Sequence, residues 1–442
     1  MKKVFLYFLI FTVLLSVVAF AEETEETVTD TTKITETLIE ETGEGTETAG
    51  EKVEEPENLI RVGLFFGNTA VTELKVKTSQ AFKLPGNLAP YYSLSFYYVY
   101  ETGGMKVVGS NGDLLAEVGK EEPYLVLAES GEFETGGRTY RHSFEVTSIN
   151  GALRVVNILP LDHYLYGVLP NEIYPSWGEE ALRTTAVAAR SFTLASVSGK
   201  HQSDGFDVCT NTHCQMYRGK GTEYKSTNKA VDDTSGLVLA YNGKIISAMY
   251  NANNGGYTEG TENVWVAKLP YYVAKPDPYT PEDVWSVSFT PEEVKELLAK
   301  RGVDIGEVRR IEVESYAQSG RAIKLTVVGR NGEYSLTKDS IRSLFNLRST
   351  MFTVNTTGTA SKSFIDAIIA MENSADVGLA VASLTDTNLT FTFNGRGYGH
   401  GVGISQWGCK YMADAGKTYE EILGFYYEGA EIKHLNDFAE LK

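Results

Sequence analysis

The chain has little of what a nucleic-acid-binding protein needs. Its 442 residues carry 40 Lys and Arg against 58 Asp and Glu, a formal net charge of −18. We find no basic stripe, no basic helix and no aromatic residues interleaved with cations that would follow a phosphate backbone. Internal repeats are also absent from the sequence. We therefore expect no nucleic-acid partner.

The acidity is concentrated in residues 22–57, which consist largely of Glu and Thr. Fourteen acidic residues stand there against Lys33 and Lys52, a net charge of −12. Low hydrophobicity and self-repelling charge cannot offset the entropy of ordering such a segment. We expect a disordered spacer without chemistry, which leaves residues 58–442 with a net charge of only −8.

The first 21 residues have the features of an export signal. Lys2 and Lys3 precede an apolar stretch, and Ala19-Phe20-Ala21 supplies the small-x-small pattern of a signal-peptidase site. The apolar stretch is marginal for a spanning helix, which needs about 20 residues. The sequence predicts export to the periplasm, the cell wall or the outside, with residues 1–21 either a cleaved signal peptide or an N-terminal anchor.

The remaining residues, about 385, suffice for two or three packed units. Alternating apolar and polar positions predict strands at Ile60–Phe66, Tyr124–Leu127, Leu237–Tyr241, Ile245–Tyr250, Ala322–Val328 and Leu389–Phe393. Because helices and strands do not alternate regularly, we expect an α+β fold with mixed, mainly antiparallel sheets and a few helices. We divide the chain into a β-rich part at 58–150, with a possible insertion, and a core at 151–435.

Three segments are predicted to be helical. The first begins near Ser176, with Glu179 three residues later as a possible capping box. The second has Thr290 as its cap and Pro291 at its first position, and ends before Gly302. The third covers Phe364–Met371.

One carboxylate, Glu172, lies among apolar and aromatic neighbours just before a helical run. These neighbours are Leu169, Pro170, Ile173, Tyr174 and Trp177. Partial desolvation disfavours the charged form of a carboxyl and raises its pKa, as a general acid requires. The alternative is a solvated charge near a helix N-terminus, which the helix dipole would keep ionised. These residues alone leave both interpretations open.

A second informative block, GRGYGHGVGISQWG, spans residues 395–408 and has six glycines in fourteen positions. Glycine at every second position is unfavourable inside a strand or a helix, so we expect a tightly bent loop. The spacing fits neither a P-loop nor a dinucleotide fingerprint. The loop presents residue types that bind sugars, namely Tyr398, His400, Ser405, Gln406 and Trp407. A structural histidine and a core tryptophan are the alternatives for His400 and Trp407.

A third block, DVCTNTHCQMY at residues 207–217, holds two of the three cysteines. Cys209, His213 and Cys214 could bind zinc through two thiolates and an imidazole, although their spacing matches no standard pattern. In an exported protein Cys209 and Cys214 could instead form a disulfide, or remain reduced structural thiols. Cys409 lies too far along the chain to assign.

Taken together, these blocks resemble the SpoIID/LytB family, which includes stage II sporulation protein D and the amidase enhancers of bacterial cell walls. The resemblance extends in order from about Leu59 to Ile432, and segment 80–150 is its least typical part. Besides the Glu172 and glycine blocks, it rests on THCQMYRG at 212–219 and on the segments 228–265, 319–329 and 419–429. It implies a SpoIID-type domain with a central cleft.

The resemblance implies lytic cleavage of peptidoglycan glycan strands, with Glu172 as the catalytic residue and no cofactor needed for catalysis. Ordinary glycosidases use two carboxyl groups, whereas a lytic transglycosylase needs one. Protonated Glu172 would donate to the glycosidic oxygen between N-acetylmuramic acid and N-acetylglucosamine. As a carboxylate it would then deprotonate the muramic C6 hydroxyl, which closes a 1,6-anhydro ring.

The family's functional arginine falls on Arg190, which we expect to orient substrate or to support the site through a hydrogen bond. The resemblance also favours a structural zinc near His213 and Cys214. Further residues expected to bind substrate are Gln215, Gly255, Gly256, Thr258, His400, Gln406 and Trp407. Because amidase enhancers are described chiefly as stimulators of a separate enzyme, the alternative function is a non-catalytic glycan-binding module that activates a cell-wall amidase.

Overall fold

The structure is a computed structural model that describes residues 59–84, 87–197, 199–265, 267–357 and 389–438. The predicted export signal, the acidic spacer and the helix expected at Phe364–Met371 lie outside these ranges. By internal contacts the chain divides into residues 57–83 with 89–442, described below, and residues 1–56 with 84–88, of which few are described. Within the described ranges, no helix is long and apolar enough to cross a membrane.

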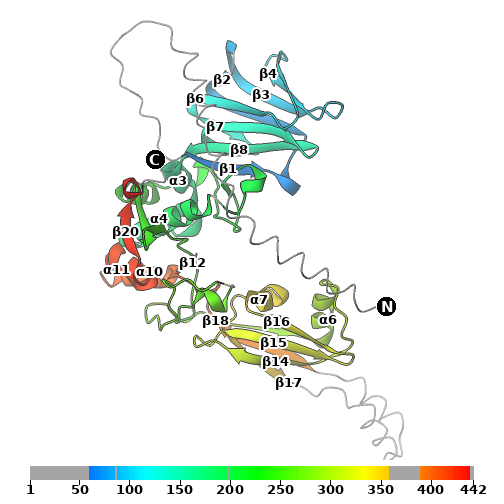
Figure 1. Cartoon of the computed structure of the whole chain (residues 1–442), viewed down its shortest axis with the longest axis vertical. Helices are drawn as coiled ribbons and strands as arrows, with labels where there is room; N and C mark the ends of the chain where they lie inside the picture. Colours follow the sequence, from blue (N-terminus) through cyan, green and yellow to red (C-terminus); the bar gives the residue numbers. More distant parts are fainter. Residues whose placement is uncertain (1–58, 85–86, 198, 266, 358–388, 439–442) are drawn as a thin grey trace, which may run out of the picture. The chain divides into compact units, whose positions relative to one another are not determined.

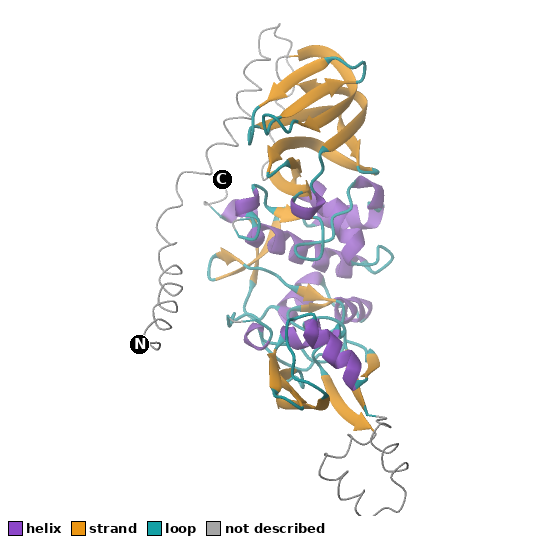
Figure 2. Ribbon diagram, turned by 90° about the vertical axis from the view of Figure 1, so that its right-hand side faces the viewer, coloured by secondary structure: helices purple, strands orange, loops and turns teal. Residues whose placement is uncertain are grey.

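The predicted α+β class is confirmed. The described ranges contain seven α-helices and five sheets whose strand pairs are mostly antiparallel, and Figure 2 shows this mixture of helices and strands. Two pairs are parallel, β1 with β9 and β12 with β19.

The largest sheet has nine strands in the order β5-β4-β3-β2-β6-β7-β8-β1-β9. Its labelled strands lie side by side in Figure 1. The strands are β1 (Leu59–Phe65), β2 (Glu73–Leu84), β3 (Asn87–Tyr98), β4 (Met105–Gly109), β5 (Leu114–Val118), β6 (Pro123–Thr135), β7 (Arg138–Ile149), β8 (Ala152–Pro160) and β9 (Val208–Cys209). Since β8 pairs with both β7 and β1, the sheet continues across residue 150, and its last strand ends at Cys209.

Four small sheets complete the strands. They are β10 (Leu237–Tyr241), β11 (Lys244–Ile245) and β20 (Glu431–His434); β12 (Tyr250–Asn251) and β19 (Ile404–Ser405); β13 (Val284–Phe289), β17 (Phe352–Thr357) and β18 (Thr390–Arg396); and β14 (Val308–Tyr316), β15 (Ala322–Gly329) and β16 (Glu333–Thr337). The prediction of one strand over Ile245–Tyr250 was wrong, because β11 ends at Ile245 and Tyr250 pairs with Ile404 in another sheet. The other five strand predictions agree with the structure to within a few residues, except that β6 is longer than predicted.

The helices are α3 (Leu161–Glu172), α4 (Glu179–Ser196), α5 (Lys225–Asp233), α6 (Pro291–Ala299), α7 (Asp339–Phe345), α10 (Gln406–Asp414) and α11 (Tyr419–Tyr426). Short 3-10 turns lie at Gly67–Thr69, Gln202–Asp204, Lys220–Thr222, Thr261–Asn263 and Leu435–Asp437. Helix α4 contacts α3, α5, α10 and α11. Its buried alanines, among them Ala186, Ala188 and Ala189, let these neighbours approach closely.

The two predicted capping boxes had different outcomes. Thr290 caps α6 and exchanges hydrogen bonds with Glu293, as expected. The box between Ser176 and Glu179 was wrong: α4 begins at Glu179, its N-cap is Gly178, and no side chain caps it.

Residues 284–396 hold a separate apolar core. The sheet β13-β18-β17, the sheet β14-β15-β16 and helices α6 and α7 all contribute to it. In this core the Phe393 ring lies 4.9 Å from that of Phe345 and 5.1 Å from that of Phe352, between ring centroids.

Candidate functional site

Glu172 is the last residue of α3, a helix that the sequence analysis did not predict. Ile173 follows in an extended conformation and closes the helix with an N–H bond to the Leu169 carbonyl at 2.9 Å. The C-terminal end of a helix carries the negative pole of its dipole, which disfavours a carboxylate. The alternative of a charge stabilised at a helix N-terminus was therefore wrong for this position.

The Glu172 carboxyl is largely removed from water. Burial raises its pKa above the ordinary value, and a hydrogen bond that the Met216 main-chain N–H donates to Oε1 at 2.8 Å opposes part of this shift. No other acidic group among the described residues contributes to it. Buried Tyr164 and half-buried Tyr250 lie close enough for the charge of Glu172 to raise the pKa of each hydroxyl further. The expectation of a raised pKa is thus confirmed.

Gln406 connects Glu172 to the glycine block. Its Nε2 donates to the Glu172 main-chain carbonyl at 2.7 Å, which joins the end of α3 to the start of α10. Ser405 caps α10 by accepting from the Gly408 N–H at 3.2 Å. The side chain of Gln406 therefore positions the main chain next to the carboxyl.

A surface group of aromatic rings follows Glu172, and we call it the aromatic platform: Tyr174, Trp177, Trp407 and Tyr411. The Trp177 ring lies 5.3 Å from Tyr174 and 5.1 Å from Trp407, and Trp407 stacks on Tyr411 at 6.2 Å. Tyr174 is 61% exposed and Tyr411 41% exposed, while the two tryptophans are half-buried. Trp407 therefore lies at the surface and not in the core. Exposed aromatic faces of this kind bind flat, partly apolar ligands such as sugar rings.

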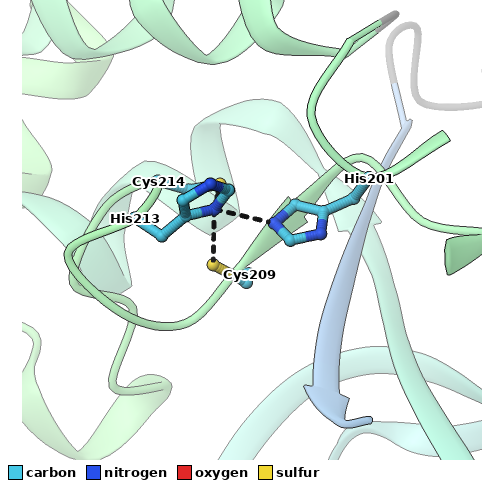
Figure 3. A group of neighbouring side chains, drawn as sticks. All are labelled: His201, Cys209, His213 and Cys214. Carbon is cyan, nitrogen blue, oxygen red and sulfur yellow. Dashed lines mark hydrogen bonds between the residues drawn. The ribbon is translucent and has the colours of Figure 1, made fainter. Parts of the chain in front are cut away.

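The cysteine segment forms a candidate metal centre, to which the structure adds His201. One ligand atom from each of His201, Cys209, His213 and Cys214 lies within 4.8 Å of the others, and Figure 3 shows the two imidazoles and the Cys209 sulfur turned toward one another. The His213 Nδ1 is 3.1 Å from the His201 Nε2, 3.8 Å from the Cys209 Sγ and 3.7 Å from the Cys214 Sγ.

These residues fit a zinc ion. In a tetrahedral site with zinc bonds of about 2.0 to 2.3 Å, neighbouring ligand atoms lie about 3.3 to 3.8 Å apart. Asp204 holds the other nitrogen of His201 at 2.8 Å, the outer contact that orients a metal-binding histidine. All three cysteines are free thiols in the structure, so Cys209 and Cys214 do not form a disulfide. A thiol hydrogen bond from Cys214 lowers the pKa of Cys209 to about 4, which favours a thiolate there.

His201 is the candidate ligand that the sequence analysis missed. It stands eight residues before Cys209, at the start of a 3-10 turn, and its ring stacks on Phe206 at 4.6 Å. The only available signal was that it is one of six histidines in the chain and lies near the cysteine segment.

Arg190 is fully buried, and its guanidinium is used inside the protein. Nε and Nη2 donate to Asp162 Oδ1 at 3.0 and 2.9 Å, and Nη1 and Nη2 donate to the carbonyls of Leu237 and Val231 at 3.1 Å. Direct substrate binding does not fit this geometry, because no guanidinium nitrogen faces solvent. The other expected role, support of the site through a hydrogen bond, does fit this geometry. Asp162, the partner of Arg190, lies in the first turn of the helix that ends at Glu172.

Gln215 and Thr258 are also buried rather than free to bind a sugar. Gln215 is 1% exposed; it accepts from Thr193 Oγ1 at 2.7 Å and donates to the Tyr250 hydroxyl at 3.1 Å. Thr258 is 3% exposed and donates to the Val273 carbonyl at 2.7 Å. Their predicted contact with substrate is therefore wrong, because their polar atoms are already paired within the protein.

The glycines of the 395–408 block, together with Gly255 and Gly256, allow two main-chain segments to pack closely against each other. Gly397, Gly399, Gly401 and Gly403 all have positive φ, which confirms the bent loop. A Cβ on Gly397 would lie 2.8 Å from the Asn253 carbonyl and from the Gly255 nitrogen. The segment carrying Gly255 and Gly256, both also at positive φ, therefore meets the glycine loop main chain to main chain.

His400 lies within the bent loop. Its Nδ1 accepts from the Val402 N–H at 3.0 Å, and its ring lies 5.1 Å from that of Trp265. Burial and the nearby Arg321 lower the pKa of His400 to about 4, so it is neutral at pH 7. This is the structural histidine that the sequence analysis gave as the alternative.

Comparison with known proteins gives two family matches. Residues 149–241, which include Glu172 and the four candidate metal ligands, match a stage II sporulation protein family. This match supports the SpoIID/LytB resemblance seen in the sequence. Residues 282–403 match a domain of unknown function.

Three relatives with similar sequences have different names. An uncharacterized protein of Brachyspira hyodysenteriae is 29% identical over 86% of this chain and 94% of its own length. The amidase enhancer of Bacillus subtilis is 30% identical over 61% of this chain but only 40% of its own length. Stage II sporulation protein D of Bacillus subtilis is 28% identical over 64% of this chain and 77% of its own length.

Proposed function

We propose that this protein is an exported peptidoglycan-remodelling enzyme, a lytic transglycosylase that cleaves the bond between N-acetylmuramic acid and N-acetylglucosamine. The observation that carries the proposal is the Glu172 carboxyl, which burial keeps at a raised pKa beside the aromatic platform. A protonated carboxyl can donate a proton, and ring faces can hold a sugar next to it.

In the proposed reaction Glu172 acts twice. Its protonated carboxyl gives the proton to the glycosidic oxygen, so that the bond between this oxygen and the muramic C1 breaks. The carboxylate that results takes the proton of the muramic C6 hydroxyl, whose oxygen bonds to C1 and closes the 1,6-anhydro ring. Water is not consumed, and Glu172 ends protonated again. The Met216 N–H supports the carboxylate between these two steps.

Arg190 acts as a positioning residue in this proposal. It links Asp162, near the start of α3, to the carbonyls of Val231 in α5 and Leu237 in β10, so it fixes the helix that presents Glu172. Zinc held by His201, Cys209, His213 and Cys214 would have four protein ligands and no open position, which suits a structural role.

The direct test is to incubate the protein with purified glycan strands, intact and stripped of stem peptides, and to analyse the products by mass spectrometry. We expect 1,6-anhydromuramic ends from wild type and at least a hundredfold slower formation by Glu172→Gln. Glu179→Gln is the matched control, since Glu179 is an exposed acid only seven residues away. If wild type forms no anhydro products, the proposed lytic transglycosylase activity is rejected.

A second candidate function is a glycan-binding protein that stimulates an N-acetylmuramoyl-L-alanine amidase. The similarity to an amidase enhancer favours it. Its test is the activity of a cell-wall amidase with and without this protein. If the protein stimulates the amidase and Glu172→Gln does so equally well, the result supports this function. If the protein neither stimulates the amidase nor pulls it down, this function is rejected.

A further inference from the structure

A hollow of about 830 Å³ lies in the region that matches a domain of unknown function, and Glu172 does not line it. It opens where β13, β17 and β18 come together, next to the turn between β14 and β15. Pockets of about 300 to 1,000 Å³ are the size that holds small ligands.

Two aromatic side chains form walls of the hollow. Trp285 is fixed, because its Nε1 donates to the Gly397 carbonyl at 3.1 Å and its ring lies directly over Gly395 in the neighbouring strand. A Cβ on Gly395 would stand 2.2 Å from the Trp285 ring, so only glycine permits this contact. Tyr316 adds a second ring and is 46% exposed. An aromatic surface is therefore in place before any ligand binds.

The hollow also offers hydrogen-bond donors and one positive charge. Arg396 is the only ionised residue among those that line it, and its Nε contacts the Met351 sulfur at 3.1 Å. No carboxylate of the described residues forms an ion pair with Arg396, whereas the nearby Arg348 pairs with Asp283. The charged edge of the hollow, at Arg396, thus suits an anion.

We propose that this hollow is a second glycan-binding site, which takes a carboxylated amino sugar. The sugar ring would lie against Tyr316 and Trp285, and its carboxylate would pair with Arg396. The choice of sugar rests on the proposed function: the muramic unit of a peptide-stripped glycan strand carries a free lactyl carboxylate, and the glucosamine unit has none. The site would retain the strand by its muramic units while Glu172 cleaves elsewhere.

The test uses the full chain with Glu172→Gln, so that nothing is cleaved, and two probes. N-acetylmuramic acid carries the carboxylate, and N-acetylglucosamine is the same sugar without it. We expect calorimetry to give about tenfold tighter binding of the muramic probe, as one charge-assisted hydrogen-bonded pair provides. Arg396→Gln should abolish the difference, and Tyr316→Ala should weaken both probes severalfold.

Controls separate this site from the rest of the surface. Arg310→Gln and Tyr100→Ala replace exposed residues of the same types outside the hollow and should change nothing. Trp407→Ala, in the aromatic platform, should leave the muramic preference intact, and thermal melting checks that each variant folds.

Two results would overturn the inference: equal binding of both sugars, or a muramic preference that survives Arg396→Gln. Binding of the dipeptide alanyl-glutamate that is lost in Arg396→Gln, with no binding of either sugar, would also reject it in favour of an acidic peptide site. Failure of the proposed function is a separate result. If wild type makes no anhydro product but the muramic preference depends on Arg396, the second site stands without the enzyme.

Discussion

The main-chain N–H of Met216 donates to Oε1 of Glu172 at 2.8 Å, across 44 residues of sequence. Met216 follows Cys214 by two residues, so the candidate metal centre and the candidate acid share one short segment. A group that fixes this segment also fixes a hydrogen-bond donor to the carboxyl. A metal bound at the candidate centre would therefore be coupled to the proposed chemistry through the backbone.

Removal of zinc should consequently reduce glycan cleavage without any role for zinc in the reaction. We expect elemental analysis of untagged protein to find about one zinc per chain. Cys209→Ser and Cys214→Ser should lose it, lower the melting temperature and slow formation of anhydro products. Cys409→Ala is the control, because Cys409 is buried elsewhere and should leave the zinc content unchanged. Metal-free protein that melts and cleaves like wild type would contradict the coupling.

The pH dependence of cleavage follows from the raised pKa of Glu172. The first step needs the protonated carboxyl, which is present below its pKa in the folded protein and disappears as the pH rises through that value. We expect kcat/KM to fall along an alkaline limb whose midpoint lies above 4.5, the ordinary glutamate value. Initial rates on peptide-free strands across the pH range provide the measurement.

A variant that changes the surroundings of Glu172 checks this assignment. Tyr250 is half-buried near the carboxyl, and Tyr250→Phe keeps the ring but removes the hydroxyl. Loss of that polar group should move the alkaline midpoint of the profile, whereas Tyr224→Phe, at an exposed position, should not. An alkaline limb that stays in place in both variants would assign the titration to another group.

Much of this architecture followed from local sequence pattern. The strands near Ile60 and Leu237 and the Thr290 cap depend on alternation and on one side-chain hydrogen bond, which neighbouring residues determine. The α+β class followed from the irregular order of such elements. The bent glycine loop was equally readable, because positive φ is a property of single residues.

The site was harder to predict because long-range contacts create it. Helix α3 contains Pro170, which argues against a helix in sequence, and only its packing against α4 and α5 accounts for the position of Glu172. Arg190 and Gln215 have the residue types of a binding site, but tertiary structure buries them and pairs their polar atoms. His201 and the Trp177 to Trp407 contact join segments that no spacing rule connects.

Substitution of Arg190 should damage both stability and activity. Arg190→Met leaves Asp162 without its buried partner, and removal of one member of such a pair costs about 3 to 5 kcal/mol. Arg183→Met breaks only a more exposed network with Glu179, Glu180 and Asp233, for which we expect about 1 kcal/mol or less. Urea unfolding of both variants measures the difference.

A readout beyond stability tests the positioning role of Arg190. Arg190→Lys keeps a charge near Asp162 but cannot reproduce the bonds to both Val231 and Leu237. If Arg190 acts by placing Glu172, this variant should lower kcat in its folded fraction and leave KM near wild type. A rise in KM at unchanged kcat would indicate direct substrate binding instead.

The aromatic platform makes the most direct prediction about substrate. Its rings lie at the surface next to Glu172, so truncation should remove contact area for sugar faces without opening the core. Tyr411→Ala and Trp407→Ala should each weaken binding of peptide-free strands to the Glu172→Gln protein by about five- to tenfold, since such aromatic contacts are worth about 1 to 1.5 kcal/mol. Tyr224→Ala, which removes an exposed ring outside the platform, should bind like the parent. Strand binding that is equal in all three variants would show that the platform does not contact the glycan, and the sugar would then have to reach Glu172 from another side.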